Sequence, residues 1–123
     1  MNKKTNLDFV SIQVNDLQAS SEFYQNLIGF QPNQDQFNPE ALVFSDKKGS
    51  IFAIRKQMKD LSKVPNKGAG IALWFAVSDI KTLYKKIKDS KYTILQSPKP
   101  SPFGDTIIVE DPDGYNITFH EYS

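Results

Sequence analysis

The stretch Val109–Glu121, VEDPDGYNITFHE, decides the fold because the chain contains a second version of it. The earlier version, Phe44–Lys56, reads FSDKKGSIFAIRK. In both, a four-residue turn ending in glycine precedes a run in which apolar and polar residues alternate, which is the period of a half-buried strand. The two glycines, Gly49 and Gly114, are 114 − 49 = 65 positions apart. Each stretch predicts a β-hairpin, and together they indicate an internal repeat.

The repeat extends towards the N-terminal side of each hairpin. Strand-like segments at residues 7–14 and 71–77 are each followed by a helix-capping pair, Asn15-Asp16 or Ser78-Asp79. Asp16 and Asp79 are 79 − 16 = 63 positions apart. Amphipathic helices are expected next, over residues 17–28 and 80–90. The remaining expected strands cover residues 41–45, 50–55, 92–95, 106–110 and 116–121, and residues 97–104 read as an extended, proline-stiffened segment.

We therefore predict an α+β fold in one domain spanning residues 1–123. Two βαβββ modules, about residues 7–56 and 70–122, form a curved mixed sheet around a cleft, with the helices outside and a linker at about residues 57–69. The segment 55–70 carries five basic residues. It is either a solvated connection, which we favour, or a patch for an anionic partner.

The composition excludes several classes of function. With no Cys and one His, the chain has no disulfide scaffold, thiolate metal site, Cys nucleophile or His-rich zinc site. A net charge of +1 argues against a nucleic-acid partner, and no apolar run is long enough to span a membrane. We expect a soluble, cytoplasmic protein without a signal peptide. Fifteen aromatic residues and few catalytic side chains remain as its most distinctive feature.

Two motifs resemble those of a known family. They are VNDL at Val14–Leu17, followed by FYQNLIGF at Phe23–Phe30, and EDPDGYNI at Glu110–Ile117. In this order, with the repeat between them, they resemble the vicinal-oxygen-chelate superfamily, which includes glyoxalase I, extradiol dioxygenases, fosfomycin-modifying enzymes and bleomycin-resistance proteins. The resemblance covers residues 7 to about 122 and implies the fold. Function stays open, because this scaffold carries both metalloenzymes and metal-free binding proteins.

The resemblance also implies where a metal would be held, at four inward-facing strand positions. Here those positions carry Phe9, Ala53, Ala72 and Thr118. A phenyl ring, two methyl groups and a hydroxyl cannot hold a divalent ion, which needs imidazole or carboxylate ligands. We therefore expect a member of the metal-free branch, with no metal and no cofactor.

Strand alternation then predicts the residues that line the cleft. The predicted ligand-binding residues are Phe9, Gln13, Arg55, Trp74, Phe103, Asn116, Thr118 and His120. Apolar walls with a few polar groups are typical of a pocket for an organic ligand, and aromatic walls favour flat ligands. Trp74 either recognises the ligand or fills the space of a metal, and Phe103 either closes the cleft or is an exposed loop aromatic.

No catalytic residue is assigned, and His120 is the one weak candidate. His120 could have a functional role, as a ligand contact or a general base. The alternative is a half-exposed histidine at the end of a strand that has no functional role. Glu110 and Glu121 are expected to face elsewhere. No Ser–His–Asp order, phosphate loop or pair of carboxylates on one helix face is present in the sequence.

The favoured function is binding of a small aromatic or organic molecule without a metal, as in drug-sequestering proteins of the bleomycin-resistance type. The near-neutral charge suggests a ligand less cationic than bleomycin. The alternatives are a glyoxalase-like or dioxygenase-like metalloenzyme, a metal-free enzyme with His120 as base, and an interaction module whose cleft is filled by its own side chains. By analogy with the family we expect a homodimer.

Overall fold

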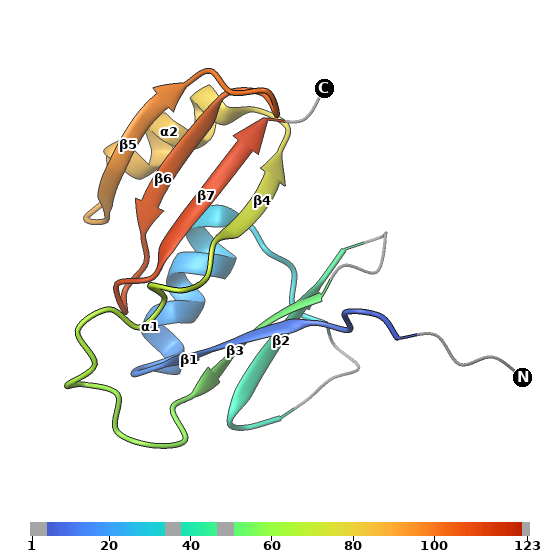
Figure 1. Ribbon diagram of the computed structural model, residues 1–123, viewed down its shortest axis with the longest axis vertical. Helices are drawn as coiled ribbons and strands as arrows, with labels where there is room; N and C mark the ends of the chain where they lie inside the picture. The colour runs from blue at the N-terminus through green and yellow to red at the C-terminus, as the bar shows by residue number, and fades with distance from the viewer. Residues whose placement is uncertain (1–4, 34–37, 47–50, 122–123) are drawn as a thin grey trace, which may run out of the picture. The chain divides into compact units, whose positions relative to one another are not determined.

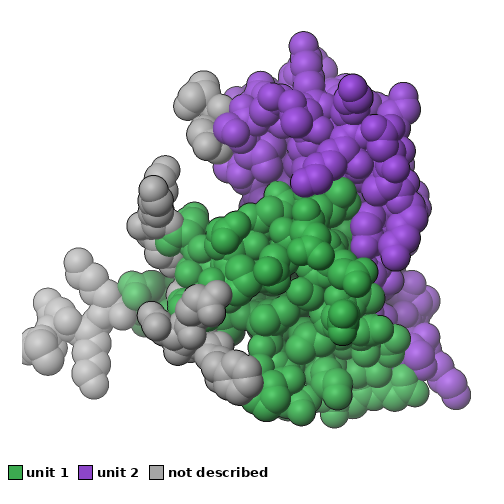
Figure 2. Space-filling model, turned by 180° about the vertical axis from the view of Figure 1, so that it is seen from behind, with its two compact units in different colours: residues 1–60 green, residues 61–123 purple. Residues whose placement is uncertain are grey.

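The computed structural model describes residues 5–33, 38–46 and 51–121. The chain divides into two compact units, residues 1–60 and 61–123, coloured separately in Figure 2. Within the described residues, each unit contains one sheet and one helical segment. The predicted α+β class is therefore confirmed. Within the described residues, no helix is long and apolar enough to cross a membrane.

The first unit builds its sheet from strands that are not consecutive in the sequence. Its elements are β1 (Val10–Val14), α1 (Leu17–Ser21), η1 (Glu22–Ile28), β2 (Ala41–Ser45) and β3 (Ile51–Lys56). The sheet order is β1-β3-β2, with β1 parallel and β2 antiparallel to β3. An isolated bridge joins Pro32 to Phe44 on the outer side of β2.

The helix of this unit starts at a cap and ends at a glycine. The Asp16 carboxylate accepts hydrogen bonds from the amides of Gln18 and Ala19, at 3.0 and 3.2 Å. After Ser21 the helix widens into a π-helical segment, in which the amide of Gly29 donates to the carbonyl of Tyr24 at 3.1 Å. Gly29 then ends the helix with a φ of 99°, a conformation that favours glycine.

Aromatic side chains make up much of the core of this unit. Tyr24 is fully buried, with ring centroids 5.3 Å from Phe52 and 4.8 Å from Phe23. Phe44 stacks against its cross-strand partner Phe52 at 6.3 Å. Much of the aromatic excess in the sequence therefore stabilises this core by burial and edge-to-face packing.

The second unit has a four-stranded sheet, and a helix lies against one face of it (Figure 1). Its elements are β4 (Leu73–Val77), α2 (Ile80–Lys88), β5 (Thr93–Lys99), β6 (Thr106–Glu110) and β7 (Asn116–Glu121). The sheet order is β4-β7-β6-β5, with β4 parallel to β7 and the other pairs antiparallel. This is a complete βαβββ module.

The structure confirms the repeat. In both units the first strand pairs in parallel with the last strand, which pairs in turn with the strand before it. Both helices begin at the predicted aspartates, and Asp79 accepts from the amide and the hydroxyl of Thr82. The hydroxyl bond is the main reason why the pKa of Asp79 is below its ordinary value, so this capping contribution is lost as the pH falls through that lowered pKa.

Element boundaries differ from the prediction at several ends. The first strand starts at Val10, the fourth starts at Leu73, and α2 ends at Lys88. The largest difference is β5, which continues through the expected proline-stiffened segment as far as Lys99. β5 is an edge strand and its pairing with β6 is irregular between Ile94 and Lys99, so a proline there removes no required bond. The predicted turn at residues 46–49 lies largely outside the described residues.

The second glycine turn is organised around a buried carboxylate. One oxygen of Asp111 accepts from the amides of Asp113 and Tyr115, at 2.9 and 2.8 Å. The amide of Gly114 donates to the Asp111 carbonyl at 3.0 Å, and the φ of Gly114 is 90°. The turn therefore sets the register between β6 and β7.

We predict that Asp111→Ala lowers the free energy of unfolding by about 1–3 kcal/mol, because the buried Tyr115 amide loses its acceptor. Asp111→Asn keeps an acceptor oxygen at the same place and serves as the matched control, with a smaller loss. Urea unfolding followed by circular dichroism measures both. Equal losses in the two variants would contradict this role for the oxygen.

Candidate functional site

The second unit presents two chemically different faces of its sheet. On the α2 side lie the buried side chains of Ile107, Val109, Ile117 and Phe119, together with Ile80, Leu83 and Ile87 of the helix. On the opposite side, which we call the open face, β4 and β7 place Trp74 beside its register partner Thr118. Because alternate residues share a face, Asn116 and His120 also lie on the open face.

An aromatic cluster stands on the open face. The Trp74 ring is 5.9 Å from the ring of Phe103 in an edge-to-face arrangement and 5.9 Å from the His120 ring. Trp74 nevertheless remains 47% exposed and Phe103 65% exposed. The single tryptophan therefore lies outside the core, as predicted, and almost half of its surface is open to contact.

The loop that carries Phe103 is held from several directions. The Ser101 hydroxyl donates to the Gly104 carbonyl at 2.6 Å and accepts from the Phe103 amide at 3.0 Å. Gly104 has a φ of 95°, and a Cβ there would lie on the backbone carbonyl oxygen of Glu121. Close approach and positive φ together require glycine. The loop thus has one favoured position next to β7.

His120 also holds this loop. Its Nδ1 lies 3.0 Å from the carbonyl oxygen of Phe103. A carbonyl can only accept, so this bond places a proton on Nδ1 and leaves Nε2 as the lone-pair nitrogen of the neutral ring. The ring is half-buried against Trp74. His120 therefore combines a positioning contact with a nitrogen that can accept a proton.

The other predicted site residues belong to the first unit. Phe9 precedes β1 and is 48% exposed, whereas Gln13 and Arg55 are register partners on β1 and β3. The Gln13 side-chain oxygen accepts from the Met58 amide at 2.8 Å, and Arg55 Nε donates to the Lys56 carbonyl at 3.3 Å. Both side chains therefore already form hydrogen bonds to the backbone at the C-terminal end of β3 and just after it. Among the predicted site residues, the structure therefore brings together Trp74, Phe103, Thr118 and His120 in the second unit. In the first unit it brings together Gln13 and Arg55.

The residues at the four positions where the family resemblance would place a metal do not fit one. Phe9 and Ala53 lie in the first unit, and Ala72 and Thr118 lie in the second. Ala53 is buried and Ala72 is exposed, and none of the four carries an imidazole or a carboxylate. Among the described residues, no group of three or more His, Asp and Glu side chains could hold an ion.

A pocket of about 450 Å³ lies in the second unit, at the Asn116 end of the open face. Glu110 lines it and is the register partner of Asn116, so these two side chains share a face. The expectation that Glu110 faces elsewhere is therefore wrong, because pairing within the β6–β7 hairpin fixes the face of both residues. Glu121 does face elsewhere, since its carboxylate accepts from the Ile80 amide at the start of α2 at 3.0 Å.

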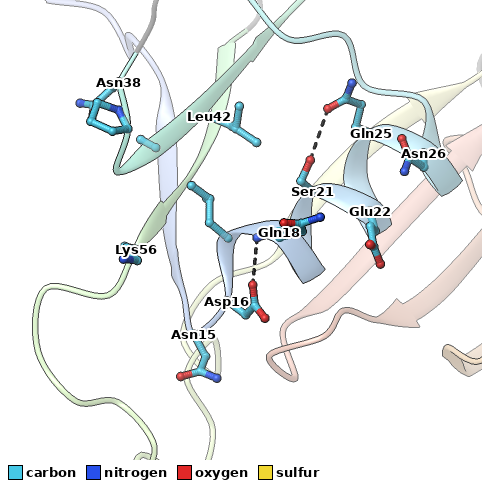
Figure 3. Close-up of a pocket in the computed structure, with 13 residues that line it drawn as sticks. Asn15, Asp16, Gln18, Ser21, Glu22, Gln25, Asn26, Asn38, Leu42 and Lys56 are labelled. Carbon is cyan, nitrogen blue, oxygen red and sulfur yellow. Dashed lines mark hydrogen bonds between the residues drawn. The ribbon is translucent and has the colours of Figure 1, made fainter.

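A second, wider hollow of about 950 Å³ lies in the first unit, beside α1 and β2 (Figure 3). Several of its polar groups already have partners within the chain. Asp16 caps α1, and the Ser21 hydroxyl donates to the side-chain oxygen of Gln25 at 3.3 Å, as the dashed lines in Figure 3 mark. Its walls are mostly polar and carry no exposed aromatic ring, unlike the open face.

Comparisons with known proteins agree with this fold. A family model described as the glyoxalase/bleomycin resistance protein/dioxygenase superfamily matches residues 6–119. Lactoylglutathione lyase of Haemophilus influenzae is 30% identical over 118 residues, which cover 89% of this chain and 87% of the relative. Virulence protein STM3117 of Salmonella typhimurium is 22% identical over 120 residues, 94% of this chain and 83% of the relative.

Solved structures show the same fold at lower identity. TnmS3, an antibiotic binding protein from Streptomyces sp. CB03234, has a TM-score of 0.75 and 19% identity, with 100% of both chains covered. A glyoxalase/dioxygenase from Nostoc punctiforme has a TM-score of 0.78 and 19% identity, covering 100% of this chain and 99% of that one.

We predict that Gly104→Ala displaces the Phe103 loop, because the added methyl group would meet the Glu121 carbonyl. Stability should fall by about 1–3 kcal/mol, as expected for a strained left-handed residue. The emission of the single tryptophan should change as Phe103 moves away from Trp74.

Gly70→Ala is the matched control, since a Cβ at Gly70 meets open space. Urea unfolding and steady-state fluorescence measure both variants. If Gly104→Ala matched Gly70→Ala in stability and emission, the loop would not depend on this glycine.

Proposed function

The chain belongs to the glyoxalase/bleomycin resistance protein/dioxygenase superfamily, and on that premise we propose that it binds a flat organic ligand on the open face of the second unit, without a metal. The observation that carries the proposal is the half-exposed indole of Trp74, which lies 5.9 Å from the rings of both Phe103 and His120. A large aromatic left at the surface and fixed by two neighbours is better suited to recognition than to core packing.

Stacking supplies the affinity in this proposal. A flat ring laid on the indole gains buried apolar area, and aromatic contact adds about 1 kcal/mol beyond that area. Because Phe103 already meets Trp74 edge-on, the platform is organised before the ligand arrives and little ordering entropy is lost. The loop bonds of Ser101 and His120 maintain that organisation.

Hydrogen bonds supply the orientation. The hydroxyl of Thr118 lies next to Trp74 in the register, with His120 and Asn116 on either side along β7. Phe9, Gln13 and Arg55 of the first unit stay predicted ligand-binding residues. A few polar groups on an apolar surface are typical of sites for small organic molecules.

The chemistry of the side chains supports the proposal of binding without a metal. The family positions Phe9, Ala53, Ala72 and Thr118 offer one hydroxyl and no anionic or imidazole donor. TnmS3, which shares the fold, is an antibiotic binding protein, and this supports a ligand-binding role on the same scaffold. We also retain the proposal of a homodimer, which sedimentation at micromolar concentration would test.

We predict that flat aromatic molecules quench the fluorescence of Trp74, the single tryptophan of the chain. A panel of aromatic antibiotics and metabolites, titrated into the protein, measures this directly. For any quencher, Trp74→Ala should weaken the affinity about tenfold by calorimetry, because stacking and apolar contact are lost. Trp74→Phe keeps an aromatic face and should lose less.

Tyr84→Ala removes a half-buried aromatic from α2, on the other side of the sheet, and is the matched control. Its affinity should equal that of the unmodified protein. Binding that is unchanged in Trp74→Ala, or quenching by no member of the panel, would refute the proposal.

A second candidate function is metal-free proton transfer with His120 as general base. The observation in its favour is the bond from Nδ1 to the Phe103 carbonyl, which leaves Nε2 able to accept a proton beside the stacking surface. The sequence relative named lactoylglutathione lyase indicates a first substrate to assay, lactoylglutathione.

We predict that any such activity persists in chelator and falls at least about 100-fold in His120→Ala. His120→Asn separates the two roles, because an amide can still donate to the Phe103 carbonyl but cannot act as a base. Activity should be lost in both variants, because neither alanine nor asparagine can accept the proton. Activity retained in His120→Asn would show that the histidine only positions the loop.

A further inference from the structure

The pocket at the Asn116 end of the open face contains a carboxylate with no use in the fold. Glu110 and Asn116 face each other across β6 and β7 and line this pocket together. Within the part of the chain that the structure describes, neither side chain has a hydrogen bond or an ion pair. Glu110 is half-buried, and one of its oxygens lies 3.5 Å from where a Cβ on Gly114 would be.

The other charges of the pocket cancel. Lys67 Nζ lies 3.3 Å from an oxygen of Asp113, and both side chains are largely buried, at 15% and 3% exposed. This pair neutralises itself and leaves the Glu110 carboxylate as the net charge of the pocket lining. A cation or a strong hydrogen-bond donor is therefore the favoured occupant.

The wall opposite the sheet is structured. The segment after residue 60 forms successive turns, with amide-to-carbonyl bonds from Val64 to Leu61, Ala69 to Asn66 and Ile71 to Gly68. Gly68 approaches the Tyr115 ring so closely that a Cβ would lie 2.8 Å from it. The Lys67–Asp113 ion pair and the Gly68–Tyr115 contact thus fix this segment beside the turn that contains Asp111.

The pocket also has an apolar part. Leu95 and Val64 line it, and both are more than 40% exposed. An occupant that carries a positive charge on a short hydrocarbon arm would cover these side chains and reach the carboxylate. A hydrated inorganic cation would gain nothing from them, so the lining favours an alkylammonium group.

We propose that Glu110 and Asn116 form a subsite for a primary ammonium group on a short alkyl arm, carried by the ligand whose ring stacks on Trp74. This rests on the proposed function for the stacking half of the ligand. Asn116 lies two residues from Thr118, the register partner of Trp74, and two residues of strand span about 7 Å. The ligand class is therefore a flat aromatic amine with an arm of about that length.

The subsite is tested first with the arm alone. Butylammonium chloride and 1-butanol are titrated into the full chain, with chemical shifts read by ¹⁵N–¹H NMR. Butylammonium should shift the Asn116 side-chain amide and the Glu110 backbone amide with an affinity about fivefold above that of butanol. Glu110→Gln should abolish this preference, and added salt should reduce it.

Glu22→Gln is the matched control, because it removes the same charge from an exposed residue of the first unit. Its preference for butylammonium should be unchanged. Trp74→Ala should also leave butylammonium binding unchanged, since the arm carries no ring. Equal shifts by the amine and the alcohol, or a preference that survives Glu110→Gln, would overturn the subsite.

The two halves are then joined in 3-(naphthalen-2-yl)propylamine, compared by calorimetry with the corresponding propanol. The amine should bind about fivefold tighter, Glu110→Gln should remove that difference, and Trp74→Ala should weaken both compounds. If both compounds bind equally through Trp74, the proposed function stands and the subsite fails. If butylammonium binds at Glu110 but neither naphthalene compound depends on Trp74, the subsite stands and the proposed function fails.

Discussion

The parallel pairing of the first strand of each unit with its last strand is the constraint on which the rest of the structure depends. Parallel neighbours cannot be joined by a tight turn, so the chain needs a longer crossover, which in both units begins with a helix. That helix covers one face of the sheet, and the described part of each unit contains one such helical segment. Among these residues, the other face therefore has no helix from its own unit. In the second unit that face carries Trp74, Thr118 and His120.

The aromatic residues are divided between these two environments. In the first unit Phe23, Tyr24, Phe44 and Phe52 are buried together and stabilise the fold. In the second unit an indole remains half-exposed, with its neighbours placed by a hydroxyl, a glycine and a ring nitrogen. Polar contacts that hold an apolar surface in position are more consistent with recognition than with packing. At one end of the same face, the carboxylate of Glu110 adds a negative charge to the lining of the pocket.

The sequence was sufficient to predict the repeat, both helix caps, the β6–β7 hairpin and the exposed position of Trp74. These features depend on local chemistry: capping aspartates, the glycine of a turn and strand alternation. The extent of β5 was not predictable, because edge strands tolerate proline and their pairing depends on β6. Glu110 could have been placed from the hairpin register with Asn116. The pocket could not, since its other wall comes from a chain segment that packs through Gly68 and Lys67.

The central claim is that this chain holds an organic molecule on Trp74 and needs no metal to do so. The most direct measurement is a crystal structure of the protein as purified without chelator, or soaked with a flat aromatic amine, with anomalous data collected for transition metals. The account predicts planar density against the Trp74 indole, an arm directed towards Glu110 and no anomalous peak near Thr118. A coordinated metal ion at Thr118, or an aromatic ligand bound away from Trp74, would contradict it.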